Sequence, residues 1–90
     1  MSVVARTVAI TNRRGLHARA SAKFVTVASN IGMTVEVEKD GSKVAGTSIM
    51  GLMMLGAAMG DSIIISANGD GADAAVQTLV DLVEAKFGEE

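Results

Sequence analysis

The chemistry that this 90-residue chain could perform centres on the run Gly15-Leu16-His17-Ala18-Arg19, which holds its only histidine. Imidazole changes charge near neutral pH and is a good nucleophile toward phosphorus. The run follows a polar break and leads into an expected helix, and the first backbone N–H groups of a helix attract anions. Arg19 adds a guanidinium that can join them. This pattern predicts a place where a phosphoryl group is accepted and handed on.

The residues around His17 would leave room for a phosphate. Gly15 can adopt a positive φ and allow a close approach, and the backbone N–H groups of Ala18, Arg19 and Ala20 are expected to point at the anion. Helix-end donors and the Arg19 side chain contribute about 1 kcal/mol apiece in a partly exposed site, which holds a phosphate without trapping it. The alternative is that His17 is structural and that Arg19 is a solvated helix charge.

Composition limits the kinds of site that this chain can hold. There is no cysteine and only one histidine, so thiolate sites and multi-histidine metal sites within one chain are excluded, and no cofactor is expected. Ninety residues predict a single domain, 1–90, with an aliphatic core because only two residues are aromatic. No stretch is long enough to span a bilayer, and the first residues lack the pattern of a secretory signal. We therefore expect a cytoplasmic protein without a membrane partner.

Charge is distributed unevenly along the chain, although the formal net charge is only −2. No acidic residue occurs before Glu36, and such a basic region can steer an acidic partner. The alternatives are a solvated basic face and a small nucleic-acid binder. The negative net charge and the lack of an aromatic platform for bases argue against the binder. The basic residues of the first third are Arg6, Arg13, Arg14, Arg19 and Lys23.

Apolar periodicity predicts seven elements in the order β-α-β-β-α-β-α. The 33–38 segment alternates strictly, with apolar residues on one face and Thr34, Glu36 and Glu38 on the other, so one sheet face is expected to meet water. Four antiparallel strands with three helices on one face form an α+β, two-layer open-faced β-sandwich. The expected strands are 3–11, 33–38, 42–45 and 62–67, and the expected helices are 18–30, 49–55 and 72–87.

The short helix 49–55 is apolar nearly all round, and Ser48 is a good N-cap for it. A domain this small cannot bury every side of such a helix, and methionine suits an adaptable docking surface. The alternative is a core segment beneath a loop. We predict a docking patch around His17 whose apolar members are Leu16 and Ala20, together with Met50, Leu52, Met53 and Leu55 where these are exposed. Its basic members are Arg13, Arg14, Arg19 and Lys23.

Two motifs together, 15–19 and 47–56, resemble the HPr/NPr family, the histidine-containing phosphocarriers of the bacterial phosphoenolpyruvate-dependent phosphotransferase system. The resemblance covers essentially the whole chain. It implies an open-faced β-sandwich in which His17 receives a phosphoryl group on Nδ1 from Enzyme I and passes it to an Enzyme IIA. It also implies that Arg19 assists, and that catalytic power lies mainly in the partners. The chain is then a monomeric carrier without independent turnover.

The resemblance also gives Ser48 a regulatory role, because Ser48 matches the position that a dedicated HPr kinase phosphorylates in some bacterial lineages. Two positions depart from the common pattern: Ala20 replaces a frequent proline, and Thr47 replaces a frequent lysine. Alanine is favourable in a first helical turn and restores an N–H donor, so the transfer is expected to survive. The Arg13-Arg14 pair and Ala20-Ser21 are similar to the nitrogen-related branch. The alternative function is therefore a regulatory phosphocarrier that acts mainly as an interaction module.

Overall fold

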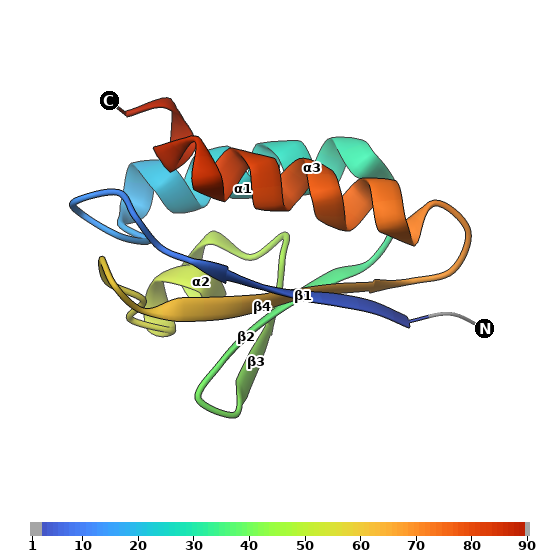
Figure 1. Cartoon of the computed structure of the whole chain (residues 1–90), viewed down its shortest axis with the longest axis horizontal. Helices are drawn as coiled ribbons and strands as arrows, with labels where there is room; N and C mark the ends of the chain where they lie inside the picture. The colour runs from blue at the N-terminus through green and yellow to red at the C-terminus, as the bar shows by residue number, and fades with distance from the viewer. Residues whose placement is uncertain (1–2, 90) are drawn as a thin grey trace.

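The computed structural model describes residues 3–89 and shows two layers, a sheet and the helices that lie on it (Figure 1). The element order agrees with the expectation, apart from a 3-10 turn, η1, that follows the last helix. In chain order the elements are β1 (Val3–Ala9), α1 (Ala18–Ile31), β2 (Val35–Lys39), β3 (Ser42–Ala45), α2 (Ile49–Met54), β4 (Ser62–Asn68), α3 (Ala72–Glu84) and η1 (Lys86–Gly88).

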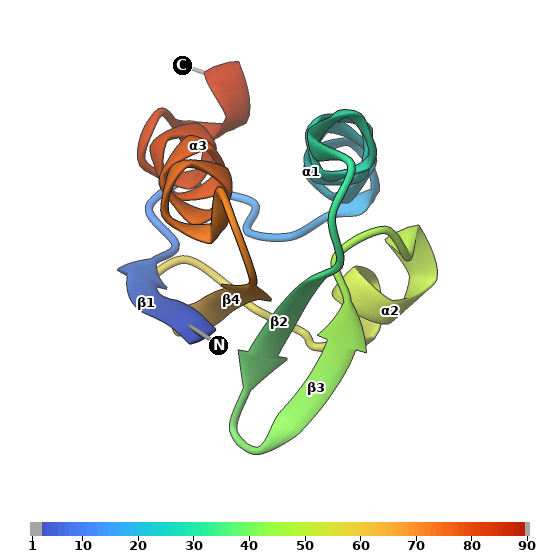
Figure 2. The same cartoon turned by 90° about the vertical axis from the view of Figure 1, so that its right-hand side faces the viewer.

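The four strands form one antiparallel sheet in the order β1-β4-β2-β3. Helices α1 and α3 lie over the same sheet face, and α2 lies beneath α1 beside β3 (Figure 2). Within residues 3–89, the other face carries no helix. The alternation expected of β2 is present, since Val35 and Val37 are buried whereas Glu36 is exposed. The α+β open-faced sandwich predicted from the sequence is confirmed.

The core between the helices and the sheet is mainly aliphatic, as the composition predicts. Ile63 and Ile65 of β4 are fully buried, and β4 is a central strand that pairs with both β1 and β2. The two aromatic side chains, Phe24 of α1 and Phe87 of η1, are also buried. Phe87 therefore anchors the end of the chain beside α1. Within the described residues, no helix has both the length and the apolarity that crossing a membrane would require.

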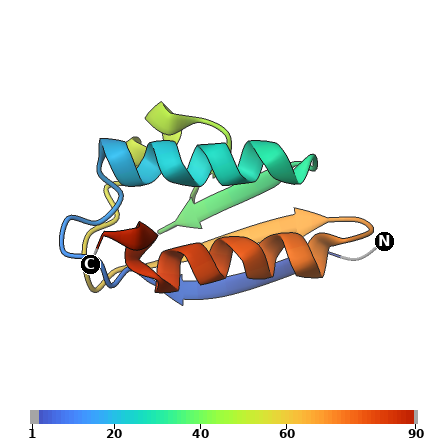
Figure 3. The same cartoon turned by 90° about the horizontal axis from the view of Figure 1, so that it is seen from above.

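The end of the last helix differs from the expectation. The stripe 72–87 predicts one helix that ends at Gly88, but α3 ends at Glu84 and the chain then turns sharply. Lys86, Phe87 and Gly88 all have φ between 55° and 74°, in the left-handed region. A straight continuation would keep the helical path, whereas this turn buries Phe87 and carries the last residues toward the start of α1 (Figure 3). The periodicity of the sequence could not reveal this reversal, because Phe87 is apolar in either geometry.

Candidate functional site

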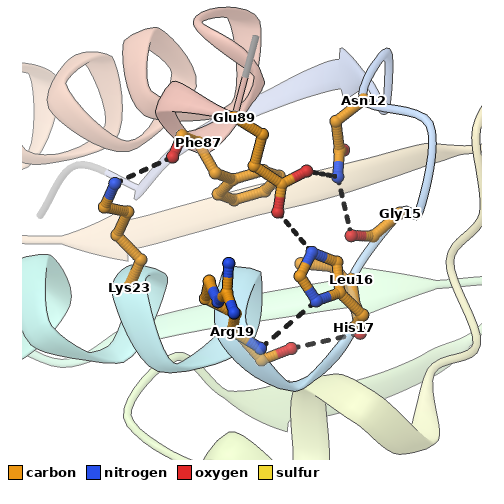
Figure 4. Close-up of polar contacts among 9 residues, drawn as sticks. Asn12, Gly15, Leu16, His17, Arg19, Lys23, Phe87 and Glu89 are labelled. Atoms are coloured by element: carbon orange, nitrogen blue, oxygen red, sulfur yellow. Dashed lines mark hydrogen bonds and ion pairs between the residues drawn. The ribbon is translucent and has the colours of Figure 1, made fainter.

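His17 occupies the N-cap position of α1, with extended backbone angles and a ring turned back over the first helical turn. Its Nδ1 accepts a hydrogen bond from the backbone N–H of Arg19 at 3.3 Å (Figure 4). The first i to i+4 bond of the helix runs from Ser21 N–H to the His17 carbonyl. The N–H groups of Ala18, Arg19 and Ala20 precede that bond, so they have no partner carbonyl within α1. Nδ1 therefore lies at the positive end of the helix dipole.

The loop before His17 has a shape that only glycine at position 15 allows. Gly15 has φ +64°, and a Cβ there would lie 2.3 Å from the Ala57 carbonyl oxygen. The same carbonyl accepts from the Leu16 N–H at 2.9 Å, and the buried Ser21 hydroxyl donates to the Leu16 carbonyl at 3.2 Å. These contacts clamp the loop between the 57–60 segment and α1. The positive φ predicted for Gly15 is confirmed, and the group that approaches it closely is the Ala57 carbonyl, which fixes the loop that presents His17.

The other ring nitrogen of His17 meets a residue from the far end of the chain. Nε2 pairs with Oε2 of Glu89, and Oε1 of Glu89 accepts from Nδ2 of Asn12 at 3.0 Å (Figure 4). The hydrogen bond from His17, followed by that from Asn12, lowers the pKa of the Glu89 carboxyl. The charge of nearby Arg14 lowers this pKa further by a smaller amount. Glu89 is therefore a carboxylate near neutral pH, and it can accept only from a protonated Nε2.

These contacts assign the ring's hydrogen. A neutral imidazole carries its proton on one nitrogen, and the hydrogen bonds that each nitrogen makes decide which one. Nε2 faces a carboxylate that needs a donor, whereas Nδ1 faces an N–H that needs an acceptor. The proton therefore lies on Nε2, and Nδ1 keeps its lone pair, which accepts the long bond from the Arg19 N–H. Nδ1 is the nitrogen equipped to act as a nucleophile.

Cationic side chains gather around the ring. A surface hollow of about 460 Å³ is bordered by four of them, and the exposed Arg19 comes from α1 itself. The His17 side chain is 15% exposed, so the ring is partly covered yet reachable from the hollow. Within residues 3–89, no three histidine or acidic side chains come together as metal ligands would. The hollow suits an anion, and its lining residues are Arg13, Arg14, His17, Arg19, Ala20, Lys23, Phe87, Gly88 and Glu89.

Lys23 has a second attachment in this hollow. Its Nζ donates to the Phe87 carbonyl at 2.9 Å, which ties α1 to the left-handed turn of η1. The sequence predicts Lys23 as a steering charge, and the structure adds that its ammonium helps to hold the end of the chain in place. Arg13 and Arg14 are exposed at the rim of the hollow, where steering charges are expected.

The exposed apolar surface near His17 differs from the predicted docking patch. Some of the predicted residues are buried, and some residues that were not predicted are exposed. Leu16 and Ala20 are at most 5% exposed, so the expectation that they contribute accessible surface is wrong. Leu52 and Leu55 are expected to contribute only where exposed, and at no more than 8% exposure they do not. Each of these side chains belongs to the core cluster, because its face of the loop or helix is turned toward the sheet layer. Met50 is exposed as predicted, and so is Met53. The exposed apolar residues of this region are Ile49, Met50, Met53, Met54 and Met59.

Ser48 caps α2, as the sequence predicts. Its Oγ accepts from the Gly51 N–H at 2.9 Å, and its backbone is extended. The side chain is half-buried, and the residues that follow it, Ile49 and Met50, are exposed. A group added to this hydroxyl would therefore lie beside the exposed methionines.

Two residues of the site escaped the sequence analysis, Asn12 and Glu89. Asn12 is fully buried, donates to the Gly15 carbonyl at 2.9 Å and reaches Glu89, while its Oδ1 has no hydrogen-bond partner in the described part of the chain. An unpaired buried acceptor costs about 1–3 kcal/mol, so stability alone does not explain this side chain. Glu89 is 72 residues from His17. No short-range spacing signals that contact.

Comparisons with known proteins agree with this geometry. The family model described as the PTS HPr component phosphorylation site matches residues 4–85. The phosphocarrier protein HPr of Neisseria meningitidis serogroup A is 46% identical over 84 residues, 93% of this chain and 94% of the relative. The phosphocarrier protein NPr of Shewanella violacea is 38% identical over 89 residues, 99% and 98% of the two chains.

The fold comparison gives the same result. The crystal structure of HPr from Thermoanaerobacter tengcongensis has a TM-score of 0.88 and 49% identity, and the match covers 100% of this chain and 99% of that one. The sequence match spans the motif around His17 and the capped helix α2, and the structural match spans every element described above. The chain therefore belongs to the HPr/NPr family of phosphocarrier proteins of the phosphotransferase system.

Proposed function

We propose that this chain accepts a phosphoryl group on Nδ1 of His17 from phosphorylated Enzyme I and passes it to an Enzyme IIA. The observation that carries the proposal is the state of the ring: Nδ1 is unprotonated at the N-terminus of α1, while Nε2 is held by Glu89. In the forward step the Nδ1 electron pair forms the N–P bond as the bond between phosphorus and Enzyme I breaks. In the second step the acceptor group of Enzyme IIA bonds to phosphorus as the N–P bond breaks, and the electron pair of that bond returns to Nδ1.

The surroundings of the ring support reversible transfer. The phosphate would lie at the first N–H groups of α1 and beside the Arg19 guanidinium, which stabilise negative charge. The hollow is open to solvent, and its carboxylate, Glu89, is paired with Nε2 of His17, so the partners would supply the remaining catalytic groups. The chain would then be a monomeric, cytoplasmic carrier without turnover of its own.

Labelling with phosphoenolpyruvate and Enzyme I tests this function. We expect one phosphate per wild-type chain, stable to alkali and labile to acid, and a phosphorus NMR signal that identifies a phosphoramidate on Nδ1. The His17→Ala variant should fold, as judged by circular dichroism, and take up no label. Undiminished acid-labile label on that variant, or a signal from phosphate on Nε2, would contradict the proposal.

The exposed residues Met50 and Met53 of α2 are the proposed apolar docking surface, together with Arg13, Arg14 and Arg19 at the basic hollow. Enzyme I and Enzyme IIA would use this surface in turn. A Met50→Asp substitution should raise the KM of Enzyme I for this chain, with little change in kcat. Val3→Asp places the same charge at an exposed apolar residue of β1 and serves as a matched control.

Phosphorylation of Ser48 by an HPr kinase is the proposed regulation. A phosphate adds about −1.5 to −2 charges, and Ser48 would bring them next to the exposed Met50 of α2. That charge should weaken docking of an acidic partner by repulsion and desolvation. A purified HPr kinase should label the wild-type chain and leave Ser48→Ala unlabelled.

A regulatory phosphocarrier of the nitrogen-related branch is the second candidate. The observation that favours it is the 38% identity with the Shewanella violacea NPr over 99% of this chain. A reconstituted chain of transfer separates the two: onward passage to sugar through a sugar-specific Enzyme II supports the sugar branch. Transfer that stops at an Enzyme IIA without sugar phosphorylation supports the regulatory one.

A further inference from the structure

The end of the chain makes a directed contact with the reactive ring. Glu89 follows three consecutive residues with left-handed backbone angles, and this reversal is anchored by buried Phe87 and by the bond from Lys23 Nζ to the Phe87 carbonyl. The Glu89 side chain is 21% exposed and pairs with Nε2 of His17 (Figure 4). A glutamate held this way differs from an acidic side chain that merely points into solvent.

Asn12 fixes the orientation of that carboxylate. Its Nδ2 donates both to Glu89 Oε1 at 3.0 Å and to the Gly15 carbonyl at 2.9 Å, so the amide bridges the end of the chain to the loop that presents His17. Asn12 is fully buried and its Oδ1 has no partner among the described residues. Asn12 therefore acts through its amide nitrogen. Because that nitrogen holds Oε1 of Glu89, the other carboxylate oxygen, Oε2, faces the ring.

The contact with Glu89 does not involve the reactive nitrogen. Glu89 binds Nε2, whereas Nδ1 lies on the other side of the ring against the Arg19 N–H. A carboxylate that blocked the reaction would have to lie at Nδ1 or at the helix N-terminus. The arrangement instead resembles the general pattern in which a carboxylate holds one imidazole nitrogen and sets the tautomer for the other.

We propose that Glu89, oriented by Asn12, is a positioning residue for phosphoryl transfer at His17, a role that rests on the function proposed above. The carboxylate holds the Nε2–H, keeps Nδ1 unprotonated and fixes the ring plane. When the Nδ1–P bond forms, the donor–P bond breaks and the Nε2 proton stays in place, so the ring becomes positively charged next to the carboxylate. When the group leaves, the electron pair of the N–P bond returns to Nδ1.

Steady-state phosphorylation of the chain by Enzyme I and phosphoenolpyruvate tests the proposal in four proteins: wild type, Glu89→Ala, Glu89→Gln and Glu84→Gln. We expect Glu89→Ala to lower kcat about tenfold, as removal of an imidazole's outer partner does elsewhere, with KM changed less than twofold. Glu89→Gln keeps an oxygen acceptor for Nε2–H and should recover part of the loss. Glu84→Gln removes an equally charged, exposed carboxylate at the end of α3 and should behave as wild type.

A spectroscopic readout separates positioning from general stabilisation. Because the chain has one histidine, nitrogen-15 NMR of the ring is free of overlap. At a pH where the ring is neutral, the wild type should show a proton on Nε2 that exchanges slowly with water. In Glu89→Ala that proton should exchange at least about ten times faster, while the backbone spectrum of the sheet stays unchanged.

Each result decides between defined alternatives. Equal kcat and equal Nε2–H exchange in Glu89→Ala and wild type would overturn the proposal, and a faster Glu89→Ala would overturn it in favour of a restraining contact. A wild-type chain that takes no label would refute the proposed function instead. In that case the exchange measurement still decides whether Glu89 holds the ring.

Discussion

Two helices of this protein begin at a capping side chain, and the comparison between them explains where the chemistry lies. His17 caps α1 through Nδ1, and Ser48 caps α2 through Oγ. Both ends present backbone N–H groups and a favourable dipole for anions. A helix N-terminus is thus common to both places, and it does not by itself select the site of transfer.

The surroundings of the two caps differ in charge and in anchoring. The His17 end borders a hollow lined by four cationic side chains and receives Glu89 from the end of the chain. The Ser48 end belongs to a six-residue helix whose exposed residues are apolar. In the proposed function, the first end holds and releases the phosphate, while the second contacts the partner. A phosphate on Ser48 would disturb the contact between α2 and the partner.

We expect the largest effect on phosphorylation when His17, the cap of α1, is replaced by serine, the residue that caps α2. His17→Ser keeps an N-cap oxygen but removes the nucleophile, so phosphoenolpyruvate-dependent labelling should fall below detection. Serine is a preferred cap, so the stability of His17→Ser should exceed that of His17→Ala by about 1 kcal/mol. Urea unfolding measures the stability difference. Label on the serine variant would show that the cap position itself, and not the imidazole, receives phosphate.

Removing the cation that lies two residues after the cap should have the next largest effect. Arg19→Ala loses a guanidinium at the hollow, and about 1 kcal/mol corresponds to a roughly fivefold change. We expect kcat for phosphorylation by Enzyme I to fall by about that factor, with Arg19→Lys recovering part of it because the charge remains. A wild-type rate in Arg19→Ala would mean that the helix N-terminus suffices.

A charge at the α2 cap should act on docking only. Aspartate is as good an N-cap as serine, so Ser48→Asp should keep the fold and raise KM for Enzyme I about threefold, with kcat unchanged. Ser48→Ala is the neutral control: KM should stay at the wild-type value, while the free energy of unfolding falls by about 1 kcal/mol. An unchanged KM in Ser48→Asp would show that α2 is not part of the surface that binds Enzyme I.

The smallest effect is the pH dependence of the contact at the end of the chain. The hydrogen bonds from His17 and Asn12 lower the pKa of Glu89 from its ordinary value of 4.5. A group with a lowered folded-state pKa stabilises the protein fully above its unfolded pKa and loses that contribution as the pH falls through the folded pKa. The stability difference between wild type and Glu89→Gln should therefore shrink as the pH falls below about 4.5. Urea unfolding of both proteins between pH 3 and pH 6 measures it, and a constant difference would contradict the Glu89 contact.

The sequence by itself determined the order of the elements and identified His17 as the candidate nucleophile. Alternation in 33–38 predicted a sheet with one wet face, although β2 begins two residues later at Val35, and the cap preferences of serine located the start of α2. The stripe of α1 outweighed the β-branched run Val25-Thr26-Val27, because burial of Phe24 and Ala28 against the sheet layer favours the helix. These features follow from short-range periodicity and local hydrogen bonding, which a linear pattern encodes.

Only the tertiary structure decided which side chains surround the ring and which of the apolar residues remain exposed. Leu52 and Met53 are neighbours of similar hydrophobicity, yet one is fully buried and the other exposed, because the direction of α2 against the fold decides the face. The acidic second half of the chain contributes Glu89 to the middle of the basic cluster, through a left-handed turn that the apolar stripe of α3 does not announce. Contacts over such separations depend on how layers pack in space, and no spacing in the sequence records them.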